Sequence, residues 1–240
     1  MTFSWEAVAD VLGEIWRRAV SEQPPPSLRT TLLLGLAALV AVSIRLTWKP
    51  VRMLATMAHE AGHAVAALVS GRRLAGIRLH ADTSGLTLSK GRPRGPGMVL
   101  TLAGGYPAPT VLGLGAAVLL GLGYSAGVLW LLVAACVLML VLIRNLYGLL
   151  MMLVAGGLLA AVSWLAPPVV LSGVAVSVVW LLLLSAPRPL VELARDRGRG
   201  SDVDQLARIT VLPGWFWLAL FWLFTVAGLV AGGYLMLRGR

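Results

Sequence analysis

Long apolar stretches separated by short polar breaks make up most of the chain. Seven of these stretches are long enough to cross a membrane, which takes about 20 largely apolar residues in a helix. They cover residues 30–47, 53–70, 98–122, 127–143, 146–165, 169–186 and 213–236. The pattern predicts an all-α polytopic membrane protein with about seven transmembrane helices.

Two other segments have patterns of their own. Residues 3–20 place apolar side chains near one helical face and acidic side chains on much of the other, which is typical of an amphipathic helix lying on a membrane surface. Two alternating stretches, 75–80 and 85–90, flank the turn-forming residues 81–85 and predict a small β-hairpin after the second span. We expect an N-terminal amphipathic helix and linker over residues 1–29 and a single transmembrane domain over residues 30–240.

Composition and charge agree with a membrane protein and indicate its orientation. The chain is 58% hydrophobic, only 12% charged, and carries a formal net charge of +10. With seven spans, one face collects the N-terminus, loop 71–97, Arg144 and loop 187–212, which together hold 15 of the 20 Lys and Arg residues. The positive-inside rule then places the N-terminus and the hairpin in the cytoplasm of a bacterial-type cytoplasmic membrane. No aromatic residues are interleaved with the basic ones in the loops, so we expect a lipid bilayer rather than nucleic acid as the partner of this charge.

The second stretch contains the strongest chemical signal, in the sequence TMAHEAGHAVAALVSG. His59 and His63 are four residues apart, so on a helix both imidazoles can bind one metal ion. Glu60 lies beside them, within reach of a water on that metal, and zinc lowers the pKa of such a water to about 7. A packed polar cluster would be the alternative, but ionisable residues within a span are costly and usually functional. Gly62 and the alanines around it leave room for a neighbouring backbone.

This motif, followed by a hairpin, resembles the site-2 protease family of intramembrane zinc metalloproteases, in a short, divergent bacterial branch. The resemblance implies a metalloprotease-like transmembrane domain that binds Zn²⁺. Residues 102–110 correspond to the family's Gly-Pro-x-x-Asn signature but lack its asparagine. Residues 142–157 correspond to the segment with Asn-x-x-Pro and Leu-Asp-Gly, whose aspartate is the family's third zinc ligand. They offer Asn145 and Gly148 but no acidic residue.

The third ligand must therefore come from elsewhere, because catalytic zinc keeps three protein ligands. Asp202 and Asp204 lie in a cytoplasmic loop next to the end of the motif helix, and we expect one of them to lie close to the metal. The alternative is helix capping, since Ser201 followed by Asp204 fits a capping box. His80 and Asp82 in the hairpin form a weaker pair. Asn145 is a candidate to polarise the scissile carbonyl.

Two functions remain from this reasoning. The first is a zinc-dependent intramembrane endopeptidase that cleaves transmembrane segments of other membrane proteins, with Glu60 as general base and the hairpin offering an edge strand to the unwound substrate. The second is a non-proteolytic zinc-binding membrane protein that holds a partner helix, which the missing Leu-Asp-Gly favours. The discriminating feature is an acidic side chain within metal-ligand distance of both imidazoles.

Overall fold

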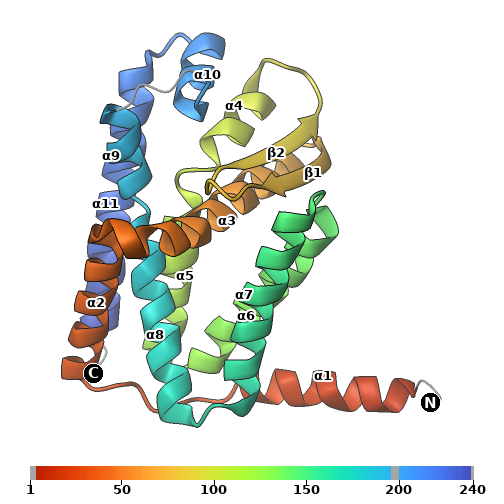
Figure 1. Ribbon diagram of the computed structural model, residues 1–240, viewed down its shortest axis with the longest axis vertical. Coiled ribbons are helices and arrows are strands. Elements are labelled where there is room, and N and C mark those ends of the chain that lie inside the picture. The colour runs from red at the N-terminus through yellow and green to blue at the C-terminus, as the bar shows by residue number, and fades with distance from the viewer. Residues whose placement is uncertain (1–3, 196–199, 239–240) are drawn as a thin grey trace.

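The computed structural model describes residues 4–195 and 200–238 (Figure 1). This part of the chain forms helices and one two-stranded sheet. The helices are α1 (Trp5–Ala19), α2 (Leu28–Ser43), α3 (Arg45–Val69), α4 (Pro96–Ala103), α5 (Ala108–Gly121), α6 (Ser125–Leu142), α7 (Leu146–Leu165), α8 (Pro168–Ser185), α9 (Arg188–Arg195), α10 (Asp202–Ile209) and α11 (Gly214–Arg238). The strands are β1 (Arg73–Leu79) and β2 (Gly85–Lys90).

The helices that could cross a membrane number between four and six in the described residues. Helices α6, α7, α8 together with α9, and α11 are each long and apolar enough to do so. Two further pairs qualify only as bent units: α2 with α3, at 100°, and α4 with α5, at 64°. The chain turns between α2 and α3 because Ile44 has an extended backbone conformation. The expected count of seven is therefore not confirmed, since α3 lies across the other helices instead of running alongside them (Figure 1).

The N-terminal helix lies at the opposite end of the molecule from the hairpin. Arg18, in the last turn of α1, donates a 2.8 Å hydrogen bond to the carbonyl of Trp164, close to the C-terminal end of α7. Asn145, at the other end of α7, bonds the hairpin. Our prediction that the N-terminus shares a face with both long loops is therefore wrong. If each bent pair is counted as one span, there are six spans instead of seven, and the first segment starts on the other side.

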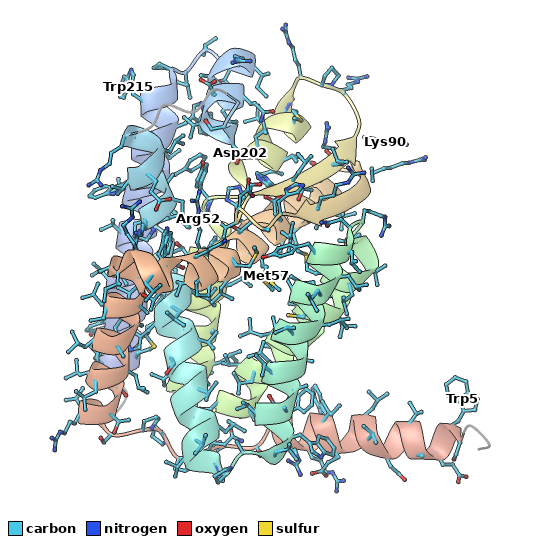
Figure 2. All side chains as sticks on the ribbon, viewed as in Figure 1. Trp5, Arg52, Met57, Lys90, Asp202 and Trp215 are labelled. Carbon is cyan, nitrogen blue, oxygen red and sulfur yellow. The ribbon has the colours of Figure 1, made fainter. Side chains whose placement is uncertain are left out.

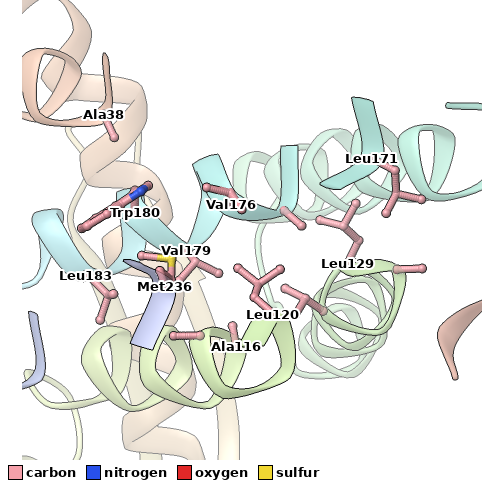
Figure 3. Close-up of a cluster of buried hydrophobic side chains, with 14 residues drawn as sticks. Ala38, Ala116, Leu120, Leu129, Leu171, Val176, Val179, Trp180, Leu183 and Met236 are labelled. Carbon is pink, nitrogen blue, oxygen red and sulfur yellow. The ribbon is translucent and has the colours of Figure 1, made fainter. Parts of the chain in front are cut away.

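The membrane-type helices pack around a core of buried aliphatic side chains with Trp180 at one end (Figure 3). This core joins α2, α5, α6, α8 and α11. Trp180 is buried and its indole nitrogen donates a 3.1 Å hydrogen bond to the carbonyl of Thr31, so its polar atom is satisfied within the core. A Cβ on Gly35 would lie within 2.9 Å of the Trp180 ring, so α2 needs a glycine there to approach α8 closely.

The expected β-hairpin is confirmed. Strands β1 and β2 pair antiparallel, and β1 begins slightly earlier than the alternation predicted. Ile77 and Leu79 of β1 are fully buried against α3, α6 and α7. Beyond the hairpin, Ile77 forms a parallel bridge with Ile143 at the end of α6. The hairpin is thus fastened to the junction of α6 and α7 and lies over one side of α3 (Figure 1).

Candidate metal centre

Helix α3 presents its histidines to the turn between α4 and α5 at very short range. A Cβ on Gly62 would overlap the carbonyl of Gly104 and the side chain of Ala108. A Cβ on Gly104 would in turn lie 2.8 Å from the carbonyl oxygen of Gly62. The expectation that small residues let a neighbouring backbone approach α3 is confirmed. Gly105 continues this contact, because a Cβ there would lie 2.6 Å from atoms of both imidazoles.

The two imidazoles converge on one point. The Nε2 atoms of His59 and His63 are 3.0 Å apart. Nδ1 of His63 donates a 2.7 Å hydrogen bond to the carbonyl of Thr101 on α4. In the neutral imidazole this bond places the proton on Nδ1 and leaves the lone pair of Nε2 directed at the convergence point. A metal ligand needs this tautomer.

Asp202 contributes a third donor atom at the same point. Its Oδ2 lies 3.1 Å from Nε2 of His59 and 3.2 Å from Nε2 of His63, and its side chain is only 15% exposed. Figure 2 shows Asp202 of α10 on the side of that helix that faces α3. Burial raises the pKa of this carboxyl, but in the metal-free protein, where the Nε2 atoms can hold protons and donate to it, the two histidines outweigh burial and keep the pKa below its usual range. The first residue of α10 therefore faces the motif helix as a carboxylate.

Asp204 does not reach this point. Its backbone nitrogen donates to the hydroxyl of Ser201 at 3.2 Å, and its Oδ2 accepts from the backbone nitrogen of Gly200 at 3.0 Å. The same oxygen pairs with Arg208 at 3.2 Å. Asp204 as a metal ligand is therefore wrong: it caps α10 and pairs along the helix surface, as the capping alternative predicted.

The three converging atoms fit a zinc ion. Zinc bonds of about 2.0–2.2 Å at tetrahedral angles place the ligand atoms about 3.3–3.5 Å apart, and the observed separations of 3.0–3.2 Å need only a small expansion. Two imidazoles and one carboxylate leave a fourth position open, as catalytic zinc sites do. His59, Glu60 and His63 form a second, overlapping set, with donor atoms within 4.8 Å of one another. We favour the set with Asp202, because its atoms are closer together and because Glu60 is bonded elsewhere.

Glu60 is buried beside the histidines and bonded to the hairpin. The residue is only 3% exposed, and its Oε2 accepts a 2.6 Å hydrogen bond from the hydroxyl of Thr87 on β2. Gly85, at the start of β2, packs against the same carboxylate. The base predicted from the motif thus lies between the convergence point and the β-hairpin.

Two cavities meet at this centre. One, of about 170 Å³, extends from His59 and Glu60 toward Arg52 and α9. The other, of about 280 Å³, extends between β2 and α10 and includes Asp202. Tyr106 lines both and packs edge-on to the ring of His59, with ring centroids 4.8 Å apart. A ligand can therefore reach the convergence point from two sides.

Asn145 has a different role from the one expected. Its side-chain nitrogen donates to the carbonyl of Leu79 at 2.7 Å, and its side-chain oxygen accepts from the backbone nitrogen of Leu79 at 3.2 Å. It lines neither of the two cavities. The assignment of Asn145 to the scissile carbonyl is therefore not supported, and its observed role is to fasten the hairpin. His80 and Asp82 lie exposed in the hairpin turn, where both contact Ser84.

Sequence reasoning missed Thr87, Gly85, Thr101 and Tyr106. Thr87 and Gly85 alternate along β2, so the strand register places both on the side of α3, but nothing in the sequence shows which element covers that side. Thr101 acts through its backbone carbonyl, for which the side chain gives no signal. Tyr106 follows two glycines in the segment GGYP, which predicts a turn but does not indicate that Tyr106 contacts His59.

Long apolar helices and a pair of converging histidines, one buried and one partly buried, with a carboxylate on either side, define a membrane-embedded protein with a metallopeptidase-type centre. Residues 32–232 match the model of the Peptidase M50B-like family. The chain therefore belongs to this family, which is the site-2 protease family, and is a membrane protein of the intramembrane metallopeptidase type. Searches of curated proteins and of solved structures gave no match.

Proposed function

We propose that the protein is a zinc-dependent intramembrane endopeptidase of a bacterial-type cytoplasmic membrane. The observation that carries this proposal is the convergence of His59, His63 and Asp202 within 3.0–3.2 Å, with Glu60 buried beside them. The absence of Leu-Asp-Gly favoured a non-proteolytic protein. Asp202 supports the enzyme instead, because it offers the carboxylate that α7 lacks.

The residues divide the chemistry between them. Zinc, when bound by His59, His63 and Asp202, would supply a Lewis acid that acidifies water and polarises a peptide carbonyl. Glu60 would take the proton from the attacking water and return it to the amine that leaves when the peptide bond breaks. The negative charge of Asp202 offsets part of the charge of a dication in this poorly hydrated site.

Strand β2 is suited to hold an unwound substrate segment. In the described residues no backbone hydrogen bond joins β2 to any element other than β1, so its outer edge is available for pairing. Gly85, Leu86 and Thr87 of this strand line the same cavity as the two histidines. A transmembrane segment that unwinds and adds to this edge would carry its peptide bonds past Glu60.

The test is cleavage by the purified, reconstituted protein of a peptide with one apolar transmembrane segment that contains a Gly-Pro break. We expect cleavage that needs about one bound zinc, since a single site with two histidines holds one ion. His59→Ala and His63→Ala should lose zinc and activity together, whereas Glu60→Gln should keep zinc and lose activity. Zinc binding without cleavage of any such peptide would support the non-proteolytic alternative.

A further inference from the structure

The hairpin holds the buried base through one hydrogen bond. In the described residues, the only hydrogen bond to either carboxylate oxygen of Glu60 comes from the hydroxyl of Thr87, at 2.6 Å. The same hydroxyl lies 3.2 Å from the backbone carbonyl of Glu60, but it has a single proton, which the shorter contact takes. A carboxylate buried this deeply depends strongly on such a partner, because an unpaired buried charge is costly.

Gly85 provides the space that this bond requires. A Cβ on Gly85 would lie 2.5 Å from Cγ and 2.6 Å from Cδ of Glu60, closer than non-bonded carbon atoms can approach. The backbone of β2 therefore touches the Glu60 side chain directly. Any side chain at position 85 would push the carboxylate away from its present position.

The position of β2 over Glu60 is fixed by bonds from two places, the α6–α7 junction and α3. Asn145 bonds both backbone groups of Leu79 on β1, and the backbone nitrogen of Arg144 donates a 2.9 Å hydrogen bond to the carbonyl of Ile77. Thr56, on α3 one turn before Glu60, donates a 2.8 Å hydrogen bond to the carbonyl of Thr83 in the turn of the hairpin. The hairpin cannot shift along α3 without breaking these bonds.

We propose that Thr87 is a positioning residue for Glu60 and that Gly85, which has no side chain, leaves the room that Glu60 needs to accept the bond from Thr87. Thr87 engages Oε2 and leaves Oε1 to exchange the proton of the reaction. The catalytic part of this inference, the effect of Thr87 on the reaction, rests on the proposed function. The mechanical part, the packing and bonding of Thr87 and Gly85 against Glu60, does not. Substrate pairing with the outer edge of β2 would then act on the same strand that sets the orientation of the base.

The mechanical part is tested by the stability of the full-length protein in detergent, with and without zinc. Gly85→Ala should lower the unfolding temperature in the wild-type background but have little effect in a Glu60→Ala background, where the carboxylate that it displaces is gone. Thr87→Val should likewise cost stability only when Glu60 is present, and Thr87→Ser, which keeps the hydroxyl, should restore it. Equal losses in both backgrounds would overturn the proposal, whatever the protein cleaves.

The catalytic part is tested with the zinc-loaded protein and its cleaved peptide. Thr87→Val should lower kcat by about tenfold or more with KM within about twofold and zinc content unchanged, because a small misplacement of a catalytic group is costly. Thr87→Ser should recover most of kcat. Thr225→Val is the matched control, since this buried hydroxyl bonds the carbonyl of Trp222 on its own helix and lines neither of the two cavities. A Thr87→Val variant with wild-type kcat would contradict the positioning role, whereas a wild-type protein that cleaves nothing would contradict only the proposed function.

Discussion

At the scale of single residues, the metal centre combines parts that the sequence reveals with parts that it conceals. His59, Glu60 and His63 could be recognised because helix geometry alone places the first and the last on one face. For the third ligand, the sequence could only narrow the candidates to two residues, Asp202 and Asp204. Residues two apart on a helix point about 200° away from each other, so one of the pair Asp202 and Asp204 had to face away from α3. Which one faces it depends on how α10 packs.

Replacing the two aspartates singly separates the metal ligand from the cap. Asp202→Asn should weaken zinc binding by about tenfold or more, because it removes the charge of a group in contact with both imidazoles. Asp204→Asn should leave zinc affinity near the wild-type value and lower stability slightly, because its carboxylate accepts from the backbone nitrogen of Gly200 and forms an exposed ion pair with Arg208. Competition with a chromophoric chelator measures both affinities. Equal affinity in the two variants would remove Asp202 from the centre.

At the scale of elements, the hydropathy pattern predicted where the helices lie in the sequence but not how they are oriented in space. Every predicted apolar stretch contains a helix, and α10 begins at the residue after Ser201, as its capping pattern indicated. The 100° bend between α2 and α3 could not be predicted, because hydropathy counts apolar residues and is blind to a single extended residue such as Ile44. This bend has a functional consequence. It lays the motif helix under the hairpin, where β2 can reach Glu60.

The attachment of the hairpin to the α6–α7 junction can be tested at Asn145. Asn145→Ala would leave both backbone groups of the buried Leu79 without their partner, at a cost of about 1–3 kcal/mol for each group that stays unpaired. Hydrogen exchange in peptides that cover residues 73–90 should become faster, while exchange in α8 should stay unchanged. Gln205→Ala serves as the control, since within residues 4–195 and 200–238 its side-chain amide bonds only the carbonyl of Gly200. Unchanged exchange in the hairpin would show that its buried side chains and its bonds to Arg144 and Thr56 hold it without Asn145.

At the scale of the whole molecule, the structure changes the expected orientation of the chain. The residues Arg45, Lys49 and Arg52 belong to the hairpin end, because they lie in the first part of α3, where Arg52 lines a cavity together with Thr83, Ser84 and Gly85 of the hairpin. Arg17, Arg18 and Arg29 lie at the opposite end with α1. The hairpin end therefore still carries 15 of the 20 Lys and Arg residues by their position in the chain, of which Arg197 and Arg199 lie outside the described residues. The positive-inside rule again favours a cytoplasmic hairpin, and, if each bent pair is counted as one span, the resulting six spans lead us to predict that both termini lie outside.

This orientation can be measured with single cysteines in a Cys136→Ala background, which removes the one native thiol. Gly13 on α1 has open space where a side chain would begin, and Arg92 is exposed after β2, so a cysteine at either position should be tolerated and reactive. A membrane-impermeant maleimide should label Gly13→Cys in intact cells, and Arg92→Cys only after the membrane is opened. Labelling of both positions from the same side would contradict the arrangement of α1 and the hairpin at opposite ends. If only Arg92→Cys is labelled from outside, α1 and the hairpin still lie at opposite ends, but the orientation in the membrane is reversed. The metal centre would then lie at the outer face of the membrane.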